Sequence, residues 1–480
     1  MSAQSKQHAH QRPSCGCSAS TRRSKQRGAA SLIVVMVLFF IMSLVAAYTS
    51  RNLIFEQRTS VNQYRSTQAF EAAEAGLEWA LAQLNGGRID ANCLEAGAAA
   101  SSTTFRQRYL NISATAPPDP PTGLVTTMMQ AAAGSAPRRA GCVWNGASWT
   151  CSCPTDTDPA LTAPVGAGVF PAFWVSFSTV GVNRPGVVQI VSNGCTRHDP
   201  DCLRSATATV NVEGRALLTA LAALKSAIPT APVAALTVLG AASSAAPGPK
   251  AIVINSDPSR GGITVQAGGV VTLADFVLTS TPGTPGAASV VQSDTSLSLL
   301  LSDLPADLTA AGYAPNDRAF ASSFGAWPNS IRLQPGAVRL DCPAGGCGAA
   351  LANAVAMNPD RVIWINGELA VGPGVIVGTA ANPAVIVVAG NGVAVPGNVS
   401  LAAGAIVNGM IYSRVSGPGP GPGPVITLKG PGIIQGAAFV EGDLTATEAP
   451  RIIFDGAVLD NLRLRAGSFV RVPGGWRDFP

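Results

Sequence analysis

The apolar positions divide the chain into three stretches with different spacing. Residues 29–48 are almost continuously apolar and carry no charge, and a helix of about 20 such residues crosses the ~30 Å hydrocarbon core of a membrane. Between residues 70 and 84 the apolar side chains recur every three or four positions, which predicts an amphipathic helix. Later in the chain, short apolar runs alternate with Gly, Pro and Asn, a pattern typical of strands and turns.

The amphipathic segment has an apolar face and an acidic face. Its apolar face consists of Phe70, Ala73, Leu77, Ala80, Leu81 and Leu84. Glu71, Glu74 and Glu78 fall on another face, and Asn85-Gly86-Gly87 is expected to end the helix. Because the apolar run continues into this segment without a break, residues 29–84 are predicted to form one helix, roughly 84 Å long at 1.5 Å per residue.

Charge predicts the orientation of this helix. Residues 1–28 contain no Asp or Glu and six basic residues: Lys6, Arg12, Arg22, Arg23, Lys25 and Arg27. The positive-inside rule therefore places residues 1–28 in the cytoplasm and the chain beyond about residue 50 across the membrane. The formal net charge of the whole chain is only +5, so the basic charge belongs to this leader, and no nucleic-acid partner is expected.

The residues around the start of the helix resemble a known family. The segments Gln26-Arg-Gly-Ala-Ala-Ser-Leu-Ile-Val-Val-Met-Val-Leu38 and Gln68-Ala-Phe-Glu-Ala-Ala-Glu-Ala-Gly-Leu77 are similar to the N-terminal domain of PilX-type minor type IV pilins. Stretches at 440–443, 458–462 and 472–479 resemble the C-termini of these proteins.

The resemblance implies a processing site and a location. A prepilin peptidase would cut after Gly28, and Ala29 would become the mature, usually N-methylated terminus. The protein would lie in a bacterial inner membrane with a single span, and its head would be periplasmic or on the surface in the pilus. An ordinary signal anchor with a helical stalk is the alternative interpretation of residues 29–84.

One position departs from the pattern of the family. Most pilins carry Glu at the fifth position of the mature chain, whereas this chain has Ile33. In the family that carboxylate pairs with the N-terminal amine of a neighbouring subunit. Its absence favours a rare subunit near one end of a fibre, or a subunit retained in the membrane, over a repeated major subunit.

Residues 86–215 are predicted to form a pilin-like β region with disulfides. Strand-like segments fall at 170–177, 187–191 and 206–212. By resemblance to pilins, a β-sheet here would pack on the second half of the long helix. The Ala- and Leu-rich segment 217–228 is ended by Pro229 and predicts a short helix.

Residues 216–480 are expected to form a Gly/Pro-rich head of a different kind. Its apolar runs lie at 251–254, 263–265, 362–365, 375–377, 385–388, 393–395, 406–407, 425–428 and 452–454. Stacked turns of such strands satisfy their backbone hydrogen bonds and bury a Val/Ile core, which predicts an irregular β-solenoid, with a β-sandwich as the alternative. The Gly-Pro repeat at 417–424 lacks a donor at every second residue and predicts an exposed loop.

The predicted fold class is therefore α+β. It combines a long N-terminal membrane-spanning pilin-like helix with a β-rich head. Four segments follow from this organisation: the leader 1–28, the helix 29–85, the pilin-like β region 86–215 and the solenoid-like head 216–480.

The cysteines predict disulfides beyond the membrane. Cys15 and Cys17 lie in the leader, and eight more follow the apolar segment, an even number that fits an oxidising compartment. Two expected pairs each enclose a short loop that contains Pro or Gly: Cys195–Cys202 and Cys342–Cys347. Cys142 is expected to pair with Cys151 or Cys153, which leaves Cys93 for the other.

No motif in the chain predicts an enzyme, a metal or a cofactor. His198 is the only histidine beyond the leader, so Cys151-Ser-Cys153 has too few partners for a zinc site. No G-x-S-x-G motif occurs, and the Gly-rich stretches 390–392 and 430–436 lack the strand–loop–helix context of a dinucleotide site. The acidic residues of the solenoid region are scattered.

Three functional hypotheses follow. The first is a minor pilin or pilus-assembly subunit of a type IV pilus, serving adhesion or motility, with other pilins, a prepilin peptidase and a tip adhesin as partners. The second is a type II secretion pseudopilin. The third is a signal-anchored β-helix adhesin or glycan-active enzyme, which a carboxylate cluster beside a sugar-sized groove would favour.

Overall fold

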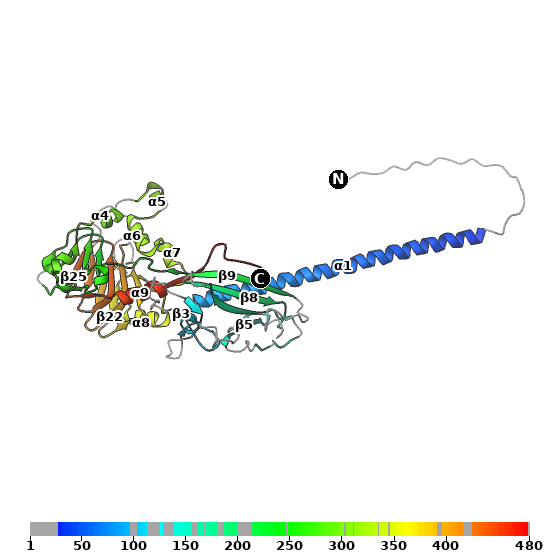
Figure 1. Ribbon diagram of the computed structural model, residues 1–480, viewed down its shortest axis with the longest axis horizontal. Coiled ribbons are helices and arrows are strands. Elements are labelled where there is room, and N and C mark those ends of the chain that lie inside the picture. The colour runs from blue at the N-terminus through cyan, green and yellow to red at the C-terminus, as the bar shows by residue number, and fades with distance from the viewer. Residues whose placement is uncertain are drawn as a thin grey trace, which may run out of the picture. The chain divides into compact units, whose positions relative to one another are not determined.

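The computed structural model (Figure 1) forms two compact units, residues 1–64 and 65–480. The residues that it describes are 27–96, 103–112, 125–127, 139–155, 161–162, 164–166, 169–180, 186–198, 214–245, 248–301, 304–310, 312–334, 336–343, 346–390, 396–415 and 425–478. The predicted strand 206–212, the apolar run 393–395 and the Gly-Pro repeat 417–424 lie outside these residues.

Helix α1 (Arg27–Leu84) is continuous over 58 residues, which confirms the single long helix. Between Ala29 and Leu84 the sequence contains no proline and one glycine, so no backbone donor of the helix ladder is missing. The amide of Asn85 still bonds the carbonyl of Leu81 at 3.1 Å. The helix ends there, at the predicted Asn-Gly-Gly sequence.

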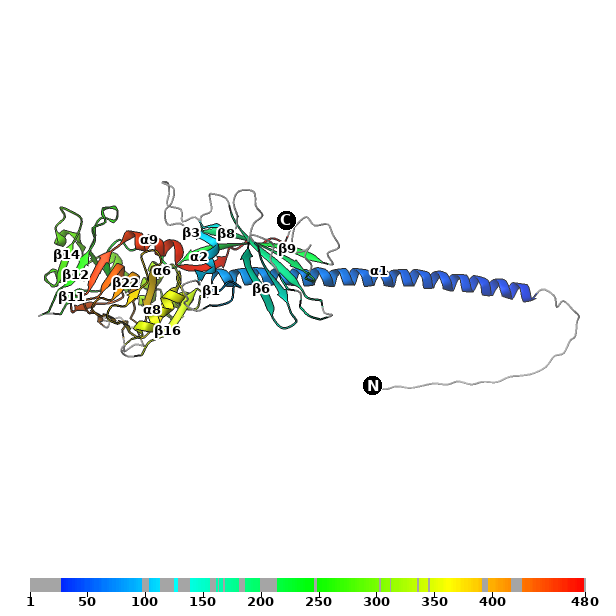
Figure 2. The same cartoon turned by 90° about the horizontal axis from the view of Figure 1, so that it is seen from below.

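Six strands form an antiparallel sheet that holds the second half of α1, residues 65–84 (Figure 2). We call it the helix-bound sheet. Its strands, in spatial order, are β27 (Gly467–Arg471), β9 (Arg215–Ser226), β8 (Val187–Cys195), β7 (Ala172–Thr179), β5 (Arg139–Trp144) and β6 (Trp149–Thr155). The strands predicted at 170–177 and 187–191 are β7 and β8.

Short elements connect α1 to this sheet. They are β1 (Arg88–Ile89), β2 (Thr103–Thr104), α2 (Phe105–Tyr109), β3 (Leu110–Ile112) and β4 (Val125–Thr127). Helix α2 begins with a capping box, in which the Thr104 hydroxyl accepts from the Gln107 amide at 3.2 Å and the Gln107 side chain accepts from the Thr104 amide at 3.3 Å.

Strand β9 occupies most of the segment for which the sequence predicts a helix, so that prediction is wrong. Leu218, Ala220 and Ala222 are buried while their neighbours are partly exposed, which is the period of a strand. Alanine and leucine favour a helix by local propensity. The flanking strands β8 and β27 override that preference, because they pair with β9 along both of its edges.

The rest of the head consists of parallel strands, which we call the parallel coil. Within the described residues, every strand pair of its 12-stranded and five-stranded sheets is parallel. Its first strands are β10 (Leu236–Val238), β11 (Ala242–Ser244), β12 (Ala251–Ile254), β13 (Val265–Ala267), β14 (Phe276–Thr279) and β15 (Val290–Val291). The short helices η1 (Pro258–Arg260), η2 (Leu273–Asp275) and η3 (Gly286–Ser289) lie between them.

The later strands make up the second half of the coil. They are β16 (Ala337–Asp341), β17 (Val362–Asn366), β18 (Leu369–Val371), β19 (Ile376–Val377), β20 (Ala384–Val388), β21 (Val399–Leu401), β22 (Ile406–Ser413), β23 (Ile426–Lys429), β24 (Ile433–Val440), β25 (Leu444–Thr447) and β26 (Arg451–Phe454). Helix α8 (Gly348–Met357) lies between β16 and β17. From β17 onwards the chain passes from the large sheet to the small sheet and back in every turn.

The long strands β22 and β24 carry glycines with positive φ in register. Gly409 pairs with Gly436 and has a φ of 143°, a conformation that L side chains rarely adopt. A Cβ atom on Gly409 would also lie 1.9 Å from the carbonyl oxygen of Ala384 in the preceding turn. Glycine is therefore required at this position of the strand.

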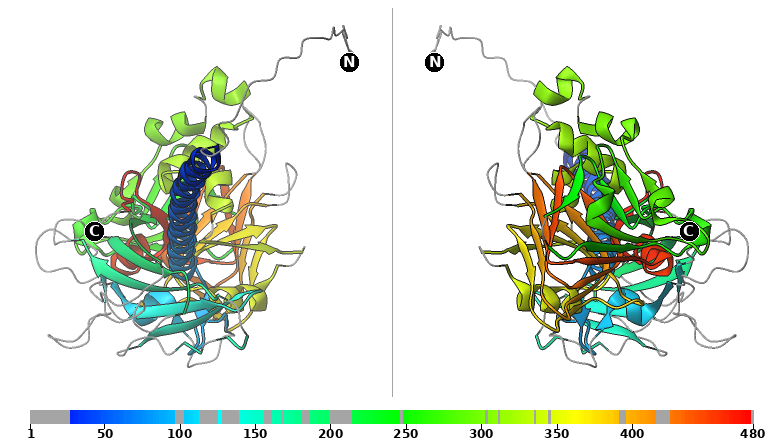
Figure 3. Two further views of the ribbon diagram at one scale, coloured as in Figure 1. Left: turned by 90° about the vertical axis from the view of Figure 1, so that its right-hand side faces the viewer. Right: turned by 90° about the vertical axis from the view of Figure 1, so that its left-hand side faces the viewer.

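The turns do not stack in the order of the chain. Leu236 pairs with Ala438 on one side and with Val265 on the other, so the first turn stacks on the last one; in Figure 3 the green strands of the first turns lie beside the orange and red strands of the last. A crossing segment then carries the chain to β16 at the opposite end of the sheet. It contains α4 (Thr295–Ser298), η4 (Leu299–Leu301), α5 (Ala306–Ala310), α6 (Pro315–Phe324) and α7 (Pro328–Arg332).

Helix α9 (Gly456–Arg465) and β27 return the chain to the helix-bound sheet, where β27 pairs with β9. The parallel coil is therefore an insertion between two neighbouring strands of that sheet. Residues 216–226 and 467–471, which the sequence assigns to the head 216–480, are strands of the helix-bound sheet.

Aromatic side chains fix the crossing segment to the coil. Tyr412 stacks on Phe439 of the next turn with 4.6 Å between ring centroids, and Phe320 and Phe324 of α6 contact Tyr412 edge-on at 5.2 and 5.1 Å. These rings are almost fully buried. Their burial and edge-on geometry stabilise the position of α6.

A buried ion network adds to this contact. Arg414 donates to Asp317 of α6 at 2.6 Å and to Glu441 at 3.0 Å. The side chains of Arg414 and Glu441 are 8% and 0% exposed. The Glu441 side chain also accepts from the Val415 amide at 3.3 Å, so the charges are hydrogen-bonded on several sides, as buried charges must be.

Candidate functional site: the helix and its seat on the head

The first part of α1 is apolar on all sides. No charged residue lies between Arg27 and Arg51, and the large apolar side chains from Leu32 to Val45 are 49% to 72% exposed. A helix that is apolar all round is stable only when its surface is covered by protein or lipid. The uncharged length of roughly 34 Å at 1.5 Å per residue matches a bilayer core.

The hydroxyl groups near the end of this segment are satisfied within the helix. Thr49 donates to the carbonyl of Val45 at 2.9 Å, and Ser50 donates to that of Ala47 at 3.2 Å. Such bonds remove the cost of placing a hydroxyl in an apolar medium. Helix α1 is thus a candidate membrane anchor.

Gly28 and Ala29, the predicted processing site, lie in the first turn of α1. The peptide bond between them is therefore helical in this structure. Ile33 follows one turn later, at the position where most pilins are expected to carry the glutamate.

The second half of α1 packs one face against the helix-bound sheet. Four residues of the predicted apolar face are fully buried: Ala73, Leu77, Ala80 and Leu84. Its other two members, Phe70 and Leu81, are partly buried against the same core, and Ala69, outside the predicted set, is fully buried as well. The predicted acidic face, with Glu71, Glu74 and Glu78, is exposed. The spacing of the apolar residues therefore decides which side of the helix the head covers.

The helix approaches strand β8 closely. A Cβ atom on Gly194 would lie 2.1 Å from the carbonyl oxygen of Ala69 and 2.3 Å from the amide nitrogen of Ala73. These distances are far below van der Waals contact, so only glycine fits at this position. The small residues Ala69 and Ala73 on the helix side allow the two backbones to approach this closely.

Aromatic rings fill the space further along the helix. Trp79 meets Phe105 of α2 edge-on at 6.1 Å, and Phe105 packs against Phe177 of β7 at 5.3 Å. Phe105, Phe173 and Phe177 are each no more than 2% exposed. The rings join α1, α2 and the sheet into one hydrophobic core.

A polar cluster closes the C-terminal end of α1. The buried guanidinium of Arg106 donates to the carbonyl of Leu84, to the side-chain oxygen of Asn85 at 2.9 Å and to the carbonyl of Gly467 at 3.0 Å. It also lies 4.8 Å from the ring centroid of Phe469. Arg106 therefore joins the end of the helix to the last strand of the sheet.

Burial changes the pKa values in this cluster. Burial lowers the pKa of Arg106 to about 10, and the nearby carboxylate of Asp360 opposes that shift. Burial raises the pKa of Asp360, while Arg106 and Arg465 oppose the rise. With this pKa, Arg106 stays charged at neutral pH.

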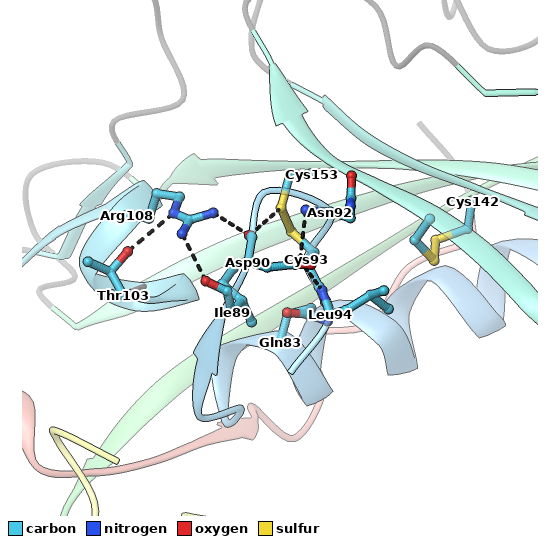
Figure 4. Close-up of a disulfide and its surroundings, with 11 residues drawn as sticks. Gln83, Ile89, Asp90, Asn92, Cys93, Leu94, Thr103, Arg108, Cys142 and Cys153 are labelled. Atoms are coloured by element: carbon cyan, nitrogen blue, oxygen red, sulfur yellow. Dashed lines mark hydrogen bonds between the residues drawn. A yellow bond between two sulfur atoms is a disulfide. The ribbon is translucent and has the colours of Figure 1, made fainter. Parts of the chain in front are cut away.

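Two disulfides flank the same end of the helix (Figure 4). Cys93 is bonded to Cys153 of β6, with 5.2 Å between Cα atoms, and Cys142 is bonded to Cys151 directly across the β5–β6 pair. The sequence left open which of Cys151 and Cys153 pairs with Cys142. The strand register decides this choice, because it places Cys142 opposite Cys151.

Hydrogen bonds hold the loop of Cys93 in place. The Asp90 side chain accepts from the amides of Asn92 and Leu94 at 2.8 and 2.9 Å, and Arg108 donates to the carbonyls of Asp90 and Ile89 at 2.6 and 2.9 Å (Figure 4). The disulfide thus connects an ordered loop after α1 to the edge strand of the sheet.

The remaining cysteines lie elsewhere. Cys342 is bonded to Cys347 at the start of α8, with 5.1 Å between Cα atoms. Cys195 at the end of β8 is disulfide-bonded, and Cys202 lies outside the described residues. Among the described residues, no cluster of three or more His, Cys, Asp or Glu side chains is arranged to hold a metal ion.

A groove of about 550 Å³ lies between η1 and α9, lined by Asp257, Asp455 and Asp460. Each carboxylate is engaged locally: Asp257 accepts from the Ser259 amide, Asp455 accepts from the Val458 amide, and Asp460 pairs with Arg260 at 2.8 Å. Their roles are therefore caps and an ion pair within the fold.

A second groove, of about 490 Å³, lies at the C-terminal end of α1, and we call it the α1 groove. Its lining residues are Glu78, Leu81, Ala82, Asn85, Gly86, Arg361, Phe469 and Arg471. No sequence pattern points to this site or to the buried Arg106. The spacing of the apolar residues could not reveal either, because the lining residues come from three segments that are each more than 100 residues apart.

One known protein family matches part of this chain. Residues 27–78 match the model of the PilX N-terminal domain family, so the resemblance to PilX-type minor pilins is confirmed over the helix. This part of the chain supports a type IV pilin-like role. No curated protein matches the chain.

One similar solved structure is the competence-associated pilin ComZ from Thermus thermophilus. The two sequences are 13% identical, the alignment covers 86% of this chain and 97% of the ComZ chain, and the TM-score is 0.20. With so low a TM-score, this similarity says nothing about the fold of the head.

Proposed function

We propose that the protein is a minor pilin or pilus-assembly subunit that enters a type IV pilus through α1 and presents the β-rich head. The observation that carries the proposal is the composition of α1. One continuous helix has an uncharged first part with exposed apolar side chains and a second part whose apolar face is buried on a sheet. The exposed apolar surface requires lipid before assembly and other helices after it.

The family resemblance extends the proposal to processing. The leader, residues 1–28, lies in the cytoplasm, where a prepilin peptidase removes it, and Ala29 becomes the N-methylated terminus of the mature chain. Ile33 in place of the usual glutamate favours a subunit that occurs rarely, near one end of the fibre. Adhesion or motility is the function that such a fibre serves, and a tip adhesin is a further partner.

The parallel coil is, in this proposal, the irregular β-solenoid. Every described strand pair of its two sheets is parallel, which supports a solenoid over a sandwich, since sandwiches are built from antiparallel pairs. Because the parallel coil is inserted between β9 and β27, the pilin-like sheet carries it as a second, larger part of the head.

Processing is the direct test. Co-expression of the full chain with a prepilin peptidase should remove 28 residues, which mass spectrometry detects, and Gly28→Leu should block the cut because a small residue is needed at this site. Gly16→Leu, in the same leader, is the matched control and should be processed normally. Chains that keep their leader, or that begin beyond Ala47, would contradict the assignment, and sheared surface filaments should contain the protein starting at Ala29.

A further inference from the structure

The α1 groove contains a cation with unused donors. Arg361 precedes β17 and is half-buried, and its one hydrogen bond to another described side chain is to Asn358 at 3.3 Å. A guanidinium carries five N–H donors, and no nitrogen of Arg361 is among the side-chain atoms that are buried without a partner, so the donors that it does not use on Asn358 are open to solvent or to a ligand. Burial lowers the pKa of Arg361, with Glu95 opposing the shift, so an anion in the groove would stabilise its charged form.

The opposite rim carries a second guanidinium. Arg471 of β27 donates to Glu78 at 2.5 Å, and these two side chains are 39% and 63% exposed. An exposed pair of this kind holds its geometry weakly. Among the residues that line the groove, two arginines therefore face one glutamate, and Glu95, which acts on Arg361, does not line it; this lining favours an anionic ligand.

The floor of the groove is largely apolar, and its polar side chain, Asn85, already uses its hydrogen-bonding groups within the fold. Leu81 and Phe469 contribute apolar surface. The Asn85 amide uses its donors on Leu81 and Phe469 and accepts from Phe469 and Arg106. Asn85 is thus unavailable to a ligand, and the charged donors that the groove still offers belong to Arg361 and Arg471.

We propose that the α1 groove binds a carboxylate side chain carried on an apolar peptide segment of a neighbouring fibre subunit. The carboxylate lies between Arg361 and Arg471, where planar guanidinium donors match its two oxygens, and the apolar part of the segment covers Leu81. Glu78 and Ala82 lie on the side of the helix that the head leaves exposed. The source of the segment rests on the proposed pilus function, whereas the ligand chemistry does not.

The binding test uses the purified full chain in detergent micelles and two dipeptides, N-acetyl-Leu-Glu-amide and N-acetyl-Leu-Gln-amide, followed by calorimetry. The Glu peptide should bind and the isosteric Gln peptide should bind roughly tenfold or more weakly, because a charge-assisted contact is lost. Arg361→Gln and, independently, Arg471→Gln should each weaken binding of the Glu peptide. Arg339→Gln, which removes an exposed arginine on β16, is the control and should leave it unchanged.

Equal binding of the two peptides, or binding unaffected by both groove variants, would overturn the proposal. Inorganic phosphate that competes with the Glu peptide at equal concentration would overturn the peptide assignment and leave a small-anion site. For the source, Arg361→Glu should reduce incorporation into sheared filaments relative to Arg339→Glu. Absence of the wild-type chain from filaments would refute the pilus function alone, whereas equal incorporation of both variants would refute the neighbouring subunit as the source.

Discussion

The side-chain amide of Asn85 binds both backbone groups of Phe469. It donates to the Phe469 carbonyl at 2.9 Å and accepts from the Phe469 amide at 2.8 Å, as a neighbouring strand would do. Strand β27 is an edge strand of the helix-bound sheet, and the parallel coil separates it along the chain from the other strands. Asn85 therefore supplies hydrogen-bond partners to the backbone of β27 on the side that faces away from β9. The end of α1 and the end of the chain are thereby joined across 384 residues.

This pairing predicts the effect of removing the amide. Asn85→Ala leaves the buried amide and carbonyl of Phe469 without partners and removes one acceptor of Arg106, so the free energy of unfolding should fall by roughly 2–4 kcal/mol. Urea denaturation of the full chain in detergent measures the change. Asn145→Ala, in the exposed β5–β6 turn, serves as the control and should cost clearly less. A loss of under 0.5 kcal/mol at Asn85 would contradict the role given to this pairing.

The close approach of α1 to β8 makes a second prediction. Gly194→Ala places a methyl group against the helix backbone at Ala69 and Ala73, so the free energy of unfolding should fall by roughly 1–3 kcal/mol. The midpoint of urea denaturation reports the difference. Gly372→Ala is a matched control, because its Cβ would meet its nearest neighbour, on Val375, at an ordinary 3.8 Å. If the two alanine variants are equally stable, the helix is not seated as described.

The buried Glu441 predicts a dependence on pH. Burial raises the pKa of Glu441 to about 7 from 4.5, although Arg414 and the hydrogen bonds from Tyr412, Arg414 and Val415 favour the ionised form. A carboxyl whose pKa is higher in the folded state stabilises the fold below pH 4.5, and this contribution is lost as the pH rises through 7. The groups that face Glu441 are Tyr412 and Arg414, with Asp317 of α6 on the far side of Arg414.

The expected result is a difference between two stability curves. Between pH 4.5 and 8 the free energy of unfolding of the wild type should fall by about 3 kcal/mol relative to Glu441→Gln, whose side chain does not titrate. Urea denaturation at several pH values measures both. Glu448→Gln, at an exposed pair with Lys429, is the control and should follow the wild-type curve. Parallel curves for the wild type and Glu441→Gln would show that the raised pKa is absent.

The sequence by itself determined the features that depend on neighbouring residues. The uncharged run sets the length of the candidate membrane anchor, and the spacing from Phe70 to Leu84 sets the face of α1 that the head buries. Asn85 and the two glycines after it set the end of the helix. Each of these follows from the helical period or from backbone freedom, which are local properties.

Tertiary structure alone decided the features that depend on distant partners. The segment 217–228 has the composition of a helix but is largely strand β9, because β8 and β27 pair along its two edges. The stacking of the first turn of the coil on the last, the pairing of Asn85 with Phe469 and the place of Arg361 in the α1 groove all join residues more than 100 positions apart. A periodic pattern specifies which face of an element is buried; it does not specify which element will cover that face.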